Sequence, residues 1–288
     1  MIILDSQRQT INDLRWALTS PNLLLSPPDN LTGNIASDIL TTQLLNGIDF
    51  NTQFSSSAKR LGHYFEELIA YAIENNPQFT LIAKNLGIFE GKQQRGEFDF
   101  IFTHQNTTYH WETAVKFYLY HPDSQVWYGP NARDRLDKKL DKLFNRQLSL
   151  SQLSSAKQLL RDKFNLTFPL KNEALIKGFL FYPFRKPQQQ IQHNWINPKH
   201  LRGWWCFQKE LQYKLASVEP SHRWAILPRL QWLSHASLIG SAEVFTANQL
   251  LDKFSEQTSP PLLVELRSIE NTWQEVSRGF VVPETWPR

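Results

Sequence analysis

The clearest hydrophobic pattern in the chain lies between residues 56 and 75, where apolar side chains recur every three or four positions. That spacing places them on one face of an α-helix. Glu66 falls at the edge of this apolar face, so its carboxylate can turn toward the interior, whereas Glu67 points away from it. We therefore predict an amphipathic helix with an acidic side chain at the border of the core.

The next part of the chain has the pattern of a β-meander. Apolar residues concentrate in three consecutive segments, 79–89, 97–103 and 108–120. Turn-forming residues separate the segments, which predicts neighbouring strands joined by short turns. In the second segment three phenylalanines share one face and Asp99 lies on the other, while Glu112 lies in the middle of the third segment. Because a carboxylate inside a strand is costly to bury alone, these strands form either a solvated edge or a charged site.

The remaining pattern predicts an α/β fold. Apolar spacing predicts helices at 6–18, 34–46, 131–149 and 151–164, and a hydrophobic run predicts a buried strand at 173–183. The order helix, three-strand meander, helix and strand describes the core, with N-terminal helices before it. Beyond residue 200, "RGWWCFQ" has a strand pattern, "SHRWAILPRLQWLS" that of a strand leading into a turn, and 243–255 that of a helix, which indicates a C-terminal α+β extension. We divide the chain into an N-terminal helical segment (1–55), the core (56–184) and the extension packed on it (185–288).

Composition narrows the class of protein. The chain has 288 residues, of which 41% are hydrophobic, and this is ample for a folded core. Cys206 is the only cysteine, which excludes an intramolecular disulfide and a cysteine-based zinc site and favours a reducing compartment. No signal-peptide pattern and no run of about 18 apolar residues occurs, so we expect a cytoplasmic protein without membrane association. The net charge of +4 permits an anionic partner without requiring one.

Acidic residues from three predicted elements suggest a metal site. Glu66 belongs to a helix that should pack on the sheet, and Asp99 and Glu112 lie on adjacent strands. Carboxylates that converge repel one another unless a cation joins them, and oxygen ligands suit Mg²⁺ or Mn²⁺. Lys116 shares a strand face with Glu112, where a lysine can orient or deprotonate water while the ion stabilises charge on a phosphate oxygen. This set describes metal-dependent hydrolysis of phosphodiester bonds.

The segments that carry these residues resemble a known nuclease superfamily. "GHYFEEL", "GEFDFIF" and "HWETAVKFYL" are similar, in this order, to the helical Glu, the G-E-x-D strand and the carboxylate-and-lysine strand of the PD-(D/E)XK nuclease-like superfamily. The resemblance implies a restriction-endonuclease-like core, with Asp99 and Glu112 as metal-binding carboxylates, Lys116 as the water-positioning base and Glu66 as an accessory ligand. Over most of its length, especially in "HWETAVKFYL" and "GPNARDRLDKKLDKL", the chain also resembles the bacterial domain-of-unknown-function family 1853, a resemblance that implies relatives but no activity.

One spacing departs from the superfamily pattern. The motif places its second carboxylate and its lysine two residues apart, whereas Glu112 and Lys116 are four apart, with Ala114 between them. Even spacing keeps both side chains on one face, but at ~3.3 Å per residue their Cα atoms lie ~13 Å apart. A β-bulge or the long lysine side chain would narrow this gap; otherwise the fold would be catalytically idle.

A basic helix face is the second candidate site. Arg133, Lys138 and Lys142 belong to the predicted helix 131–149 and are placed to approach the phosphates of DNA or RNA. Aspartates interleave with them, so the same face also fits an ordinary solvated helix surface.

Three functions stay open at this point. They are a nuclease, a non-catalytic nucleic-acid-binding or scaffold protein on the same fold, and an enzyme acting on another phosphorylated or acidic small molecule. His110, two residues before Glu112 on the same strand face, is either a residue that lines the site or a structural histidine. The pattern indicates no oligomeric state.

Overall fold

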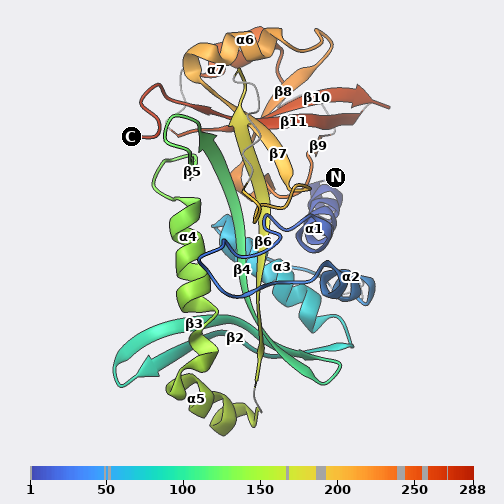
Figure 1. The fold of residues 1–288 in the computed structure, drawn as a ribbon. Coiled ribbons are helices and arrows are strands. Elements are labelled where there is room, and N and C mark those ends of the chain that lie inside the picture. The colour runs from blue at the N-terminus through green and yellow to red at the C-terminus, as the bar shows by residue number, and fades with distance from the viewer. Residues whose placement is uncertain are drawn as a thin grey trace. The chain divides into compact units, whose positions relative to one another are not determined.

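The computed structural model describes residues 2–48, 50, 53–166, 169–185, 193–238, 244–254, 259–270 and 272–288. They form a mixed α/β fold that divides into two compact units (Figure 1). Unit 1 comprises Met1–Val115, Lys138–Gly178 and His193–His200, and unit 2 comprises Lys116–Asp137, Phe179–Gln192 and Leu201–Arg288. Strands β4 (Thr107–His121) and β6 (Lys171–Pro183) contribute residues to both units. Within the described ranges no helix is long and apolar enough to span a membrane.

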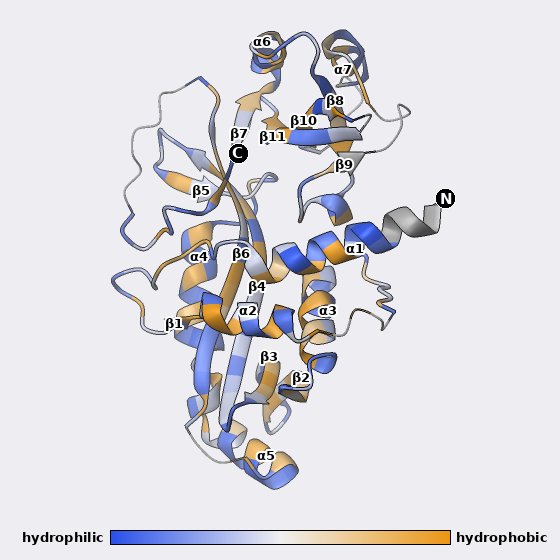
Figure 2. Ribbon diagram, turned by 90° about the vertical axis from the view of Figure 1, so that its right-hand side faces the viewer, coloured by the Kyte–Doolittle hydropathy of each residue, from blue (hydrophilic) through white to orange (hydrophobic). Residues whose placement is uncertain are grey.

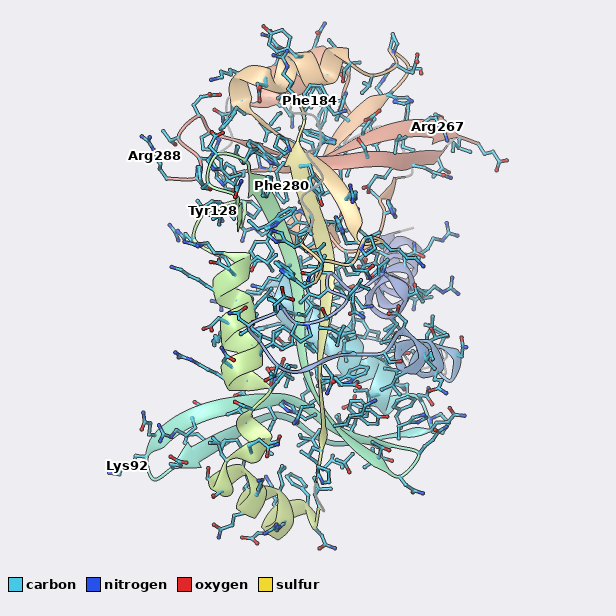
Figure 3. All side chains as sticks on the ribbon, in the orientation of Figure 1. Lys92, Tyr128, Phe184, Arg267, Phe280 and Arg288 are labelled. Atoms are coloured by element: carbon cyan, nitrogen blue, oxygen red, sulfur yellow. The ribbon has the colours of Figure 1, made fainter. Side chains whose placement is uncertain are left out.

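Unit 1 is built on the predicted meander. Strands β2 (Phe79–Glu90), β3 (Gln93–His104) and β4 are antiparallel neighbours, β6 follows β4 in the sheet, and β1 (Asn34–Ile35) runs parallel to β6. All three strands of the meander and β6 were predicted from the sequence. The phenylalanines of β3 are fully buried, as their alternation predicted. The turn between β2 and β3 carries Lys92, which projects from the end of this hairpin (Figure 3).

Helices α1, α2, α3 and α5 pack on one another or on the sheet of unit 1. Helix α3 (Leu61–Glu74) packs on β2 and β3, α1 (Ile2–Thr19) packs on α2 (Asp38–Asn46) and α3, and α5 (Ser154–Phe164) packs on β2. Helices α1 to α3 each carry hydrophobic and hydrophilic residues (Figure 2), as amphipathic helices on a core do. Helix α2 begins later than predicted, because the Ser37 hydroxyl accepts hydrogen bonds from the N–H groups of Ile39 and Leu40 and so caps the helix there.

The predicted helix 131–149 is shorter and less regular than expected. Residues before it form a turn, in which the Gly129 N–H donates to the Asp134 carbonyl at 2.8 Å. Helix α4 therefore begins at Leu136; it ends at Lys142 and continues as a π-helical turn, Leu143–Gln147. A π-turn inserts one residue into the helical repeat and redirects the side chains that follow. The prediction of one continuous helix was wrong on both sides of α4.

Gly96 of β3 lets the segment after α4 approach the strand closely. A Cβ at this position would lie 2.6 Å from a methyl group of Leu150, which is closer than two carbon atoms can pack. The π-turn and the short 3₁₀ helix Leu150–Gln152 both lie against β3. The glycine of the "GEFDF" motif thus has a packing role next to the candidate site.

Unit 2 has its own sheet arrangement and core. Strand β7 (Leu201–Phe207) is parallel to β6 and to β11 (Thr272–Val282), and the antiparallel order β11, β10 (Leu262–Ile269), β8 (Arg223–Leu227) follows. Short strands β5 (Val126–Tyr128) and β9 (Ser237–Leu238) pair with β4 and β11. Helices α6 (Leu211–Ala216) and α7 (Ala247–Phe254) pack on each other and on β7 and β8, respectively. The sequence predicted β7, β8 and α7 here, but not β10 or β11.

Candidate functional site

Asp99 and Glu112 lie where β3 and β4 separate. The backbone pairing of the two strands ends at Phe100 and Trp111. Asp99 precedes Phe100 on β3, and there its side chain replaces a backbone acceptor. Its Oδ2 accepts the N–H of Thr113 at 2.8 Å and lies 3.4 Å from the Thr113 hydroxyl. The Asp99 carboxylate therefore occupies the end of the ladder, in the place of a backbone acceptor.

The environment of Asp99 disfavours its charge. Burial is the main reason that the pKa of Asp99 is raised to about 7, and the negative charges of Glu112 and Glu66 raise it further. The N–H of Thr113 and the positive charge of Lys139 act in the opposite direction. A cation bound beside Asp99 would stabilise the ionised form and lower this pKa again.

Glu112 is fully buried and is held on both sides. Its Oε1 lies 2.9 Å from Nε2 of His110, and its Oε2 accepts a hydrogen bond from the amide of Gln147. Nδ1 of His110 lies 3.0 Å from Oδ1 of Asn172, which also accepts from the Ser151 hydroxyl. Both ring nitrogens of His110 thus face oxygen atoms, and His110 holds the Glu112 carboxylate in place from one side.

Glu66 on α3 completes a group of three interacting carboxylates. Burial raises the pKa of Glu66, and the charges of Glu97 and Glu112 also raise it, against the positive charges of His63 and Lys84. The helical phase had placed this side chain at the border of the core, and it is half-buried there. We call Glu66, Asp99 and Glu112 the carboxylate cluster; all three belong to unit 1.

The lysine that the sequence assigned to this site has another partner. Lys116 belongs to unit 2, where its ammonium group lies 2.8 Å from Oδ2 of Asp134. The same oxygen accepts a hydrogen bond from the Tyr118 hydroxyl at 3.0 Å. In unit 1 the lysine whose charge acts on Asp99 is Lys139 of α4.

Three polar residues that contribute to the site, Lys139, Gln147 and Asn172, were not predicted from the sequence. Lys139 donates to Oε1 of Gln147 at 3.2 Å, and Gln147 in turn binds Glu112. Lys139 lies beside the apolar stripe of α4, which is the same signal that singled out Glu66. Gln147 and Asn172 have no such signal, because their place depends on how irregular segments pack on the sheet.

The predicted phosphate-binding residues are all exposed. Lys138 and Lys142 lie on α4 within unit 1, one helical turn apart, so their side chains are neighbours on the helix surface. Arg133 is exposed in the turn that precedes α4 and belongs to unit 2. Each is accessible to a polyanion.

The chemistry of the carboxylate cluster suits a divalent ion, but its side chains do not form a finished cage. Carboxylate oxygens are the ligands that Mg²⁺ and Mn²⁺ prefer, and mutual repulsion of the three groups favours a cation. In the part of the chain that the structure describes, no three His, Cys, Asp or Glu side chains are grouped so that they could hold a metal ion. Each oxygen of Glu112 already accepts or faces one partner, so an ion would have to use the remaining lone pairs or displace one of these partners.

The fold and the site define a mixed α/β protein with a buried acidic cluster at the end of a strand ladder. The family model described as Domain of unknown function (DUF1853) matches residues 12–282, and the chain belongs to this family. The resemblance to domain-of-unknown-function family 1853 is thereby confirmed. No curated protein and no solved structure matches the chain.

Proposed function

We propose that the chain is a metal-dependent phosphodiesterase acting on DNA or RNA, with a restriction-endonuclease-like core of the PD-(D/E)XK type. The observation that supports this most directly is the pKa of Asp99, which burial and the charges of Glu112 and Glu66 raise to about 7. Buried carboxylates that repel one another oppose folding, and such arrangements are concentrated at functional sites. A divalent cation bound by the carboxylate cluster would remove this repulsion.

Each residue of the cluster has a proposed role. Asp99 and Glu112 would hold the ion and Glu66 would complete its ligands, while His110 orients Glu112 from the side. Bound Mg²⁺ or Mn²⁺ would polarise a phosphate oxygen and stabilise the charge that develops on it. The resemblance assigns water activation to Lys116, a role that requires Lys116 to exchange Asp134 for the water.

The exposed basic residues support nucleic acid as the class of substrate. Lys138 and Lys142 on α4, with Arg133 before the helix, would contact backbone phosphates, which are common to DNA and RNA. Contacts of this kind position a nucleic acid without reading its sequence.

A non-catalytic nucleic-acid-binding or scaffold protein on a degenerate nuclease fold is the second candidate function. The bonds already made by two key residues favour it: Lys116 is paired with Asp134, and Glu112 is held by His110 and Gln147. Under this alternative the basic face still binds nucleic acid, but the carboxylate cluster binds no ion and no bond is cleaved.

Calorimetric titration with Mg²⁺ and Mn²⁺, beside cleavage assays on plasmid and single-stranded substrates, distinguishes the two. The proposal expects the wild-type protein to bind the ion and cleave, and Asp99→Asn to lose both while keeping its fold. Asp141→Asn is a matched control, because Asp141 is an exposed aspartate of α4 bonded to Asn145. A wild-type protein that binds nucleic acid but neither binds metal nor cleaves would establish the alternative.

A further inference from the structure

Unit 2 contains a cavity of about 280 Å³ that the proposed function does not use. Leu215 and Val218 form an apolar part of its wall, and His222 and Asn248 are among the polar residues that line it. The cavity is bounded by residues of α6, β8 and the first turn of α7. It is large enough for a small organic molecule and has both an apolar and a polar side.

His222 lines the cavity, and a carboxylate holds its imidazole ring in place. Its Nδ1 lies 2.7 Å from Oε1 of Glu265 on β10. Burial alone would raise the pKa of Glu265, but bonds from Ser277 and His222 and the charge of Lys214 outweigh burial and lower it. An ionised Glu265 can only accept, so Nδ1 of His222 carries the proton and Nε2 is left as the basic nitrogen.

Buried groups on the far side of Glu265 hold it in place. The Ser277 hydroxyl donates to Oε2 of Glu265 at 2.7 Å, and the Trp204 indole donates to the Ser277 oxygen at 3.1 Å. The ammonium group of Lys214, 3.4 Å from the same carboxylate, also faces the rings of Trp204, Trp224 and Phe184, the last of which is labelled in Figure 3. Lys214 and His222 therefore both contact the Glu265 carboxylate, one on each oxygen.

Two further charged residues, Glu219 and Arg223, line the cavity. Arg223 is occupied by the turn before β8, because its Nη1 donates to the carbonyls of Pro220 and His222 at 3.0 and 2.8 Å. Glu219 lines the cavity with a charge opposite to that of Arg223. The cavity therefore has no strong net charge from these two residues, which suits an uncharged ligand.

The first turn of α7 contributes two residues, Ala247 and Asn248, to the wall of the same cavity. Thr246 and Gln249 cap each other, with the Thr246 N–H donating to Oε1 of Gln249 and the Gln249 N–H donating to the Thr246 hydroxyl. The N–H groups of Ala247 and Asn248, which line the cavity, have no acceptor within the helix. Backbone N–H groups of this kind stabilise an oxyanion that forms during acyl transfer.

We propose that this cavity is a hydrolytic site for a small uncharged ester, in which Nε2 of His222 takes a proton from the attacking water. The water oxygen forms a bond to the acyl carbon as its O–H bond breaks, and the acyl–oxygen bond of the ester then breaks. The proton on Nε2 passes to the departing alcohol, so the products are a carboxylic acid and an alcohol and the imidazole is restored. Glu265 acts as a positioning residue that fixes the tautomer of His222.

Hydrolysis of p-nitrophenyl acetate by the full chain tests this proposal. General-base catalysis uses the unprotonated imidazole, so we expect kcat/KM to be higher at alkaline than at acidic pH, and His222→Gln to lower it by at least about tenfold. Glu265→Gln should lower kcat/KM and change the pH profile, which a purely structural role would leave unaltered. His235→Gln is the matched control, because His235 is a histidine of the same unit whose side chain is 65% exposed, and it should not change the rate.

Equal rates for the wild-type protein and folded His222→Gln would overturn the proposal. A second measurement covers the case in which the variant does not fold. Wild-type protein treated with diethyl pyrocarbonate should lose activity in step with carbethoxylation of His222, followed by mass spectrometry. Full activity after complete modification of His222 would equally rule the site out.

Discussion

Buried carboxylates have opposite environments in the two units. In unit 2, burial raises the pKa of Glu275, but Arg278, His235 and the N–H of Ala236 outweigh it and lower that pKa to about 2. In unit 1, burial raises the pKa of Asp99 to about 7, and its neighbour Glu112 adds to the rise. The two carboxyl groups are both largely buried, so the difference comes from their partners.

The comparison distinguishes a carboxylate that the fold neutralises from one that it leaves without a paired cation. Glu275 has a guanidinium beside it, with Nη2 of Arg278 donating to Oε2 at 2.7 Å, and needs nothing from outside the chain. Asp99 has a backbone N–H and only the more distant charge of Lys139. A carboxylate that the fold itself does not neutralise is the better candidate for binding a cation.

The largest effect is expected from breaking the structural pair in unit 2. Arg278→Met should lower the free energy of unfolding by about 3–5 kcal/mol, because it leaves the Glu275 carboxylate buried without its cation. Arg278 also donates to the carbonyls of Trp232 and Ser234, so the loss should fall at the upper end. Urea unfolding of both proteins measures the difference. The double variant Glu275→Gln, Arg278→Met should be more stable than the single one, and a double variant that is no better would contradict this account.

The second effect is the pH dependence of stability that Asp99 causes. Its pKa is about 7 in the folded chain and ~3.9 when unfolded, so between these values the folded state binds more protons and stability falls as pH rises. In EDTA, Asp99→Asn should therefore be more stable than wild type by about 2–4 kcal/mol at pH 8 and nearly equal at pH 4. Thermal and urea unfolding across this range check it. A variant that is less stable at pH 8 would show that Asp99 is a structural partner, as Glu275 is.

Added metal should remove that pH dependence, if the proposed function holds. Saturating Mg²⁺ or Mn²⁺ favours the ionised form of Asp99 and, at 100 times its Kd, would add about 2.7 kcal/mol to the stability of the wild-type protein. Asp99→Asn should gain much less. Unfolding curves at pH 8 with and without the ion measure both. An equal response of the two proteins would place the ion elsewhere.

The smallest effect concerns the exposed lysines of α4. Charge reversal at Lys138 and Lys142 should weaken nucleic-acid binding and flatten the log–log salt dependence by ~1 for each lost phosphate contact. Lys163→Glu on α5 is a control for net charge on another exposed helix position of unit 1. Binding titrations at several salt concentrations give the slopes. Unchanged slopes would make this face an ordinary solvated surface.

Local pattern was sufficient for much of unit 1. Helix α3 and strands β2 to β4 follow from the spacing of apolar residues, and the same spacing placed Glu66 and His110 where the structure has them. The strands β10 and β11 were not predicted, although β10 begins and β11 ends with an apolar run. Strand β11 pairs in parallel with β7, whose residues lie more than 60 positions earlier, and short apolar runs carry no signal for such a distant partner.

The polar contacts of the site were harder to predict than its carboxylates. Gln147 reaches Glu112 from the π-turn. The position of this turn on β3 depends on the close approach of Leu150 to Gly96. The π-turn itself replaced the continuous helix that periodicity predicted. For Lys116, strand alternation gave no indication of the partner, because Asp134 comes from a turn whose conformation has no periodic signature.

The hydrogen bond from the Thr113 N–H to Asp99 makes this backbone amide a probe of the charge on Asp99. The strength of an N–H hydrogen bond changes when its acceptor is protonated, and Oδ2 of Asp99 is the acceptor here. The proton and nitrogen chemical shifts of the Thr113 amide should consequently titrate with the charge of Asp99 in an NMR spectrum. A single resonance would then follow both the ionisation of the buried carboxyl group and its capture by an ion, with no substrate present.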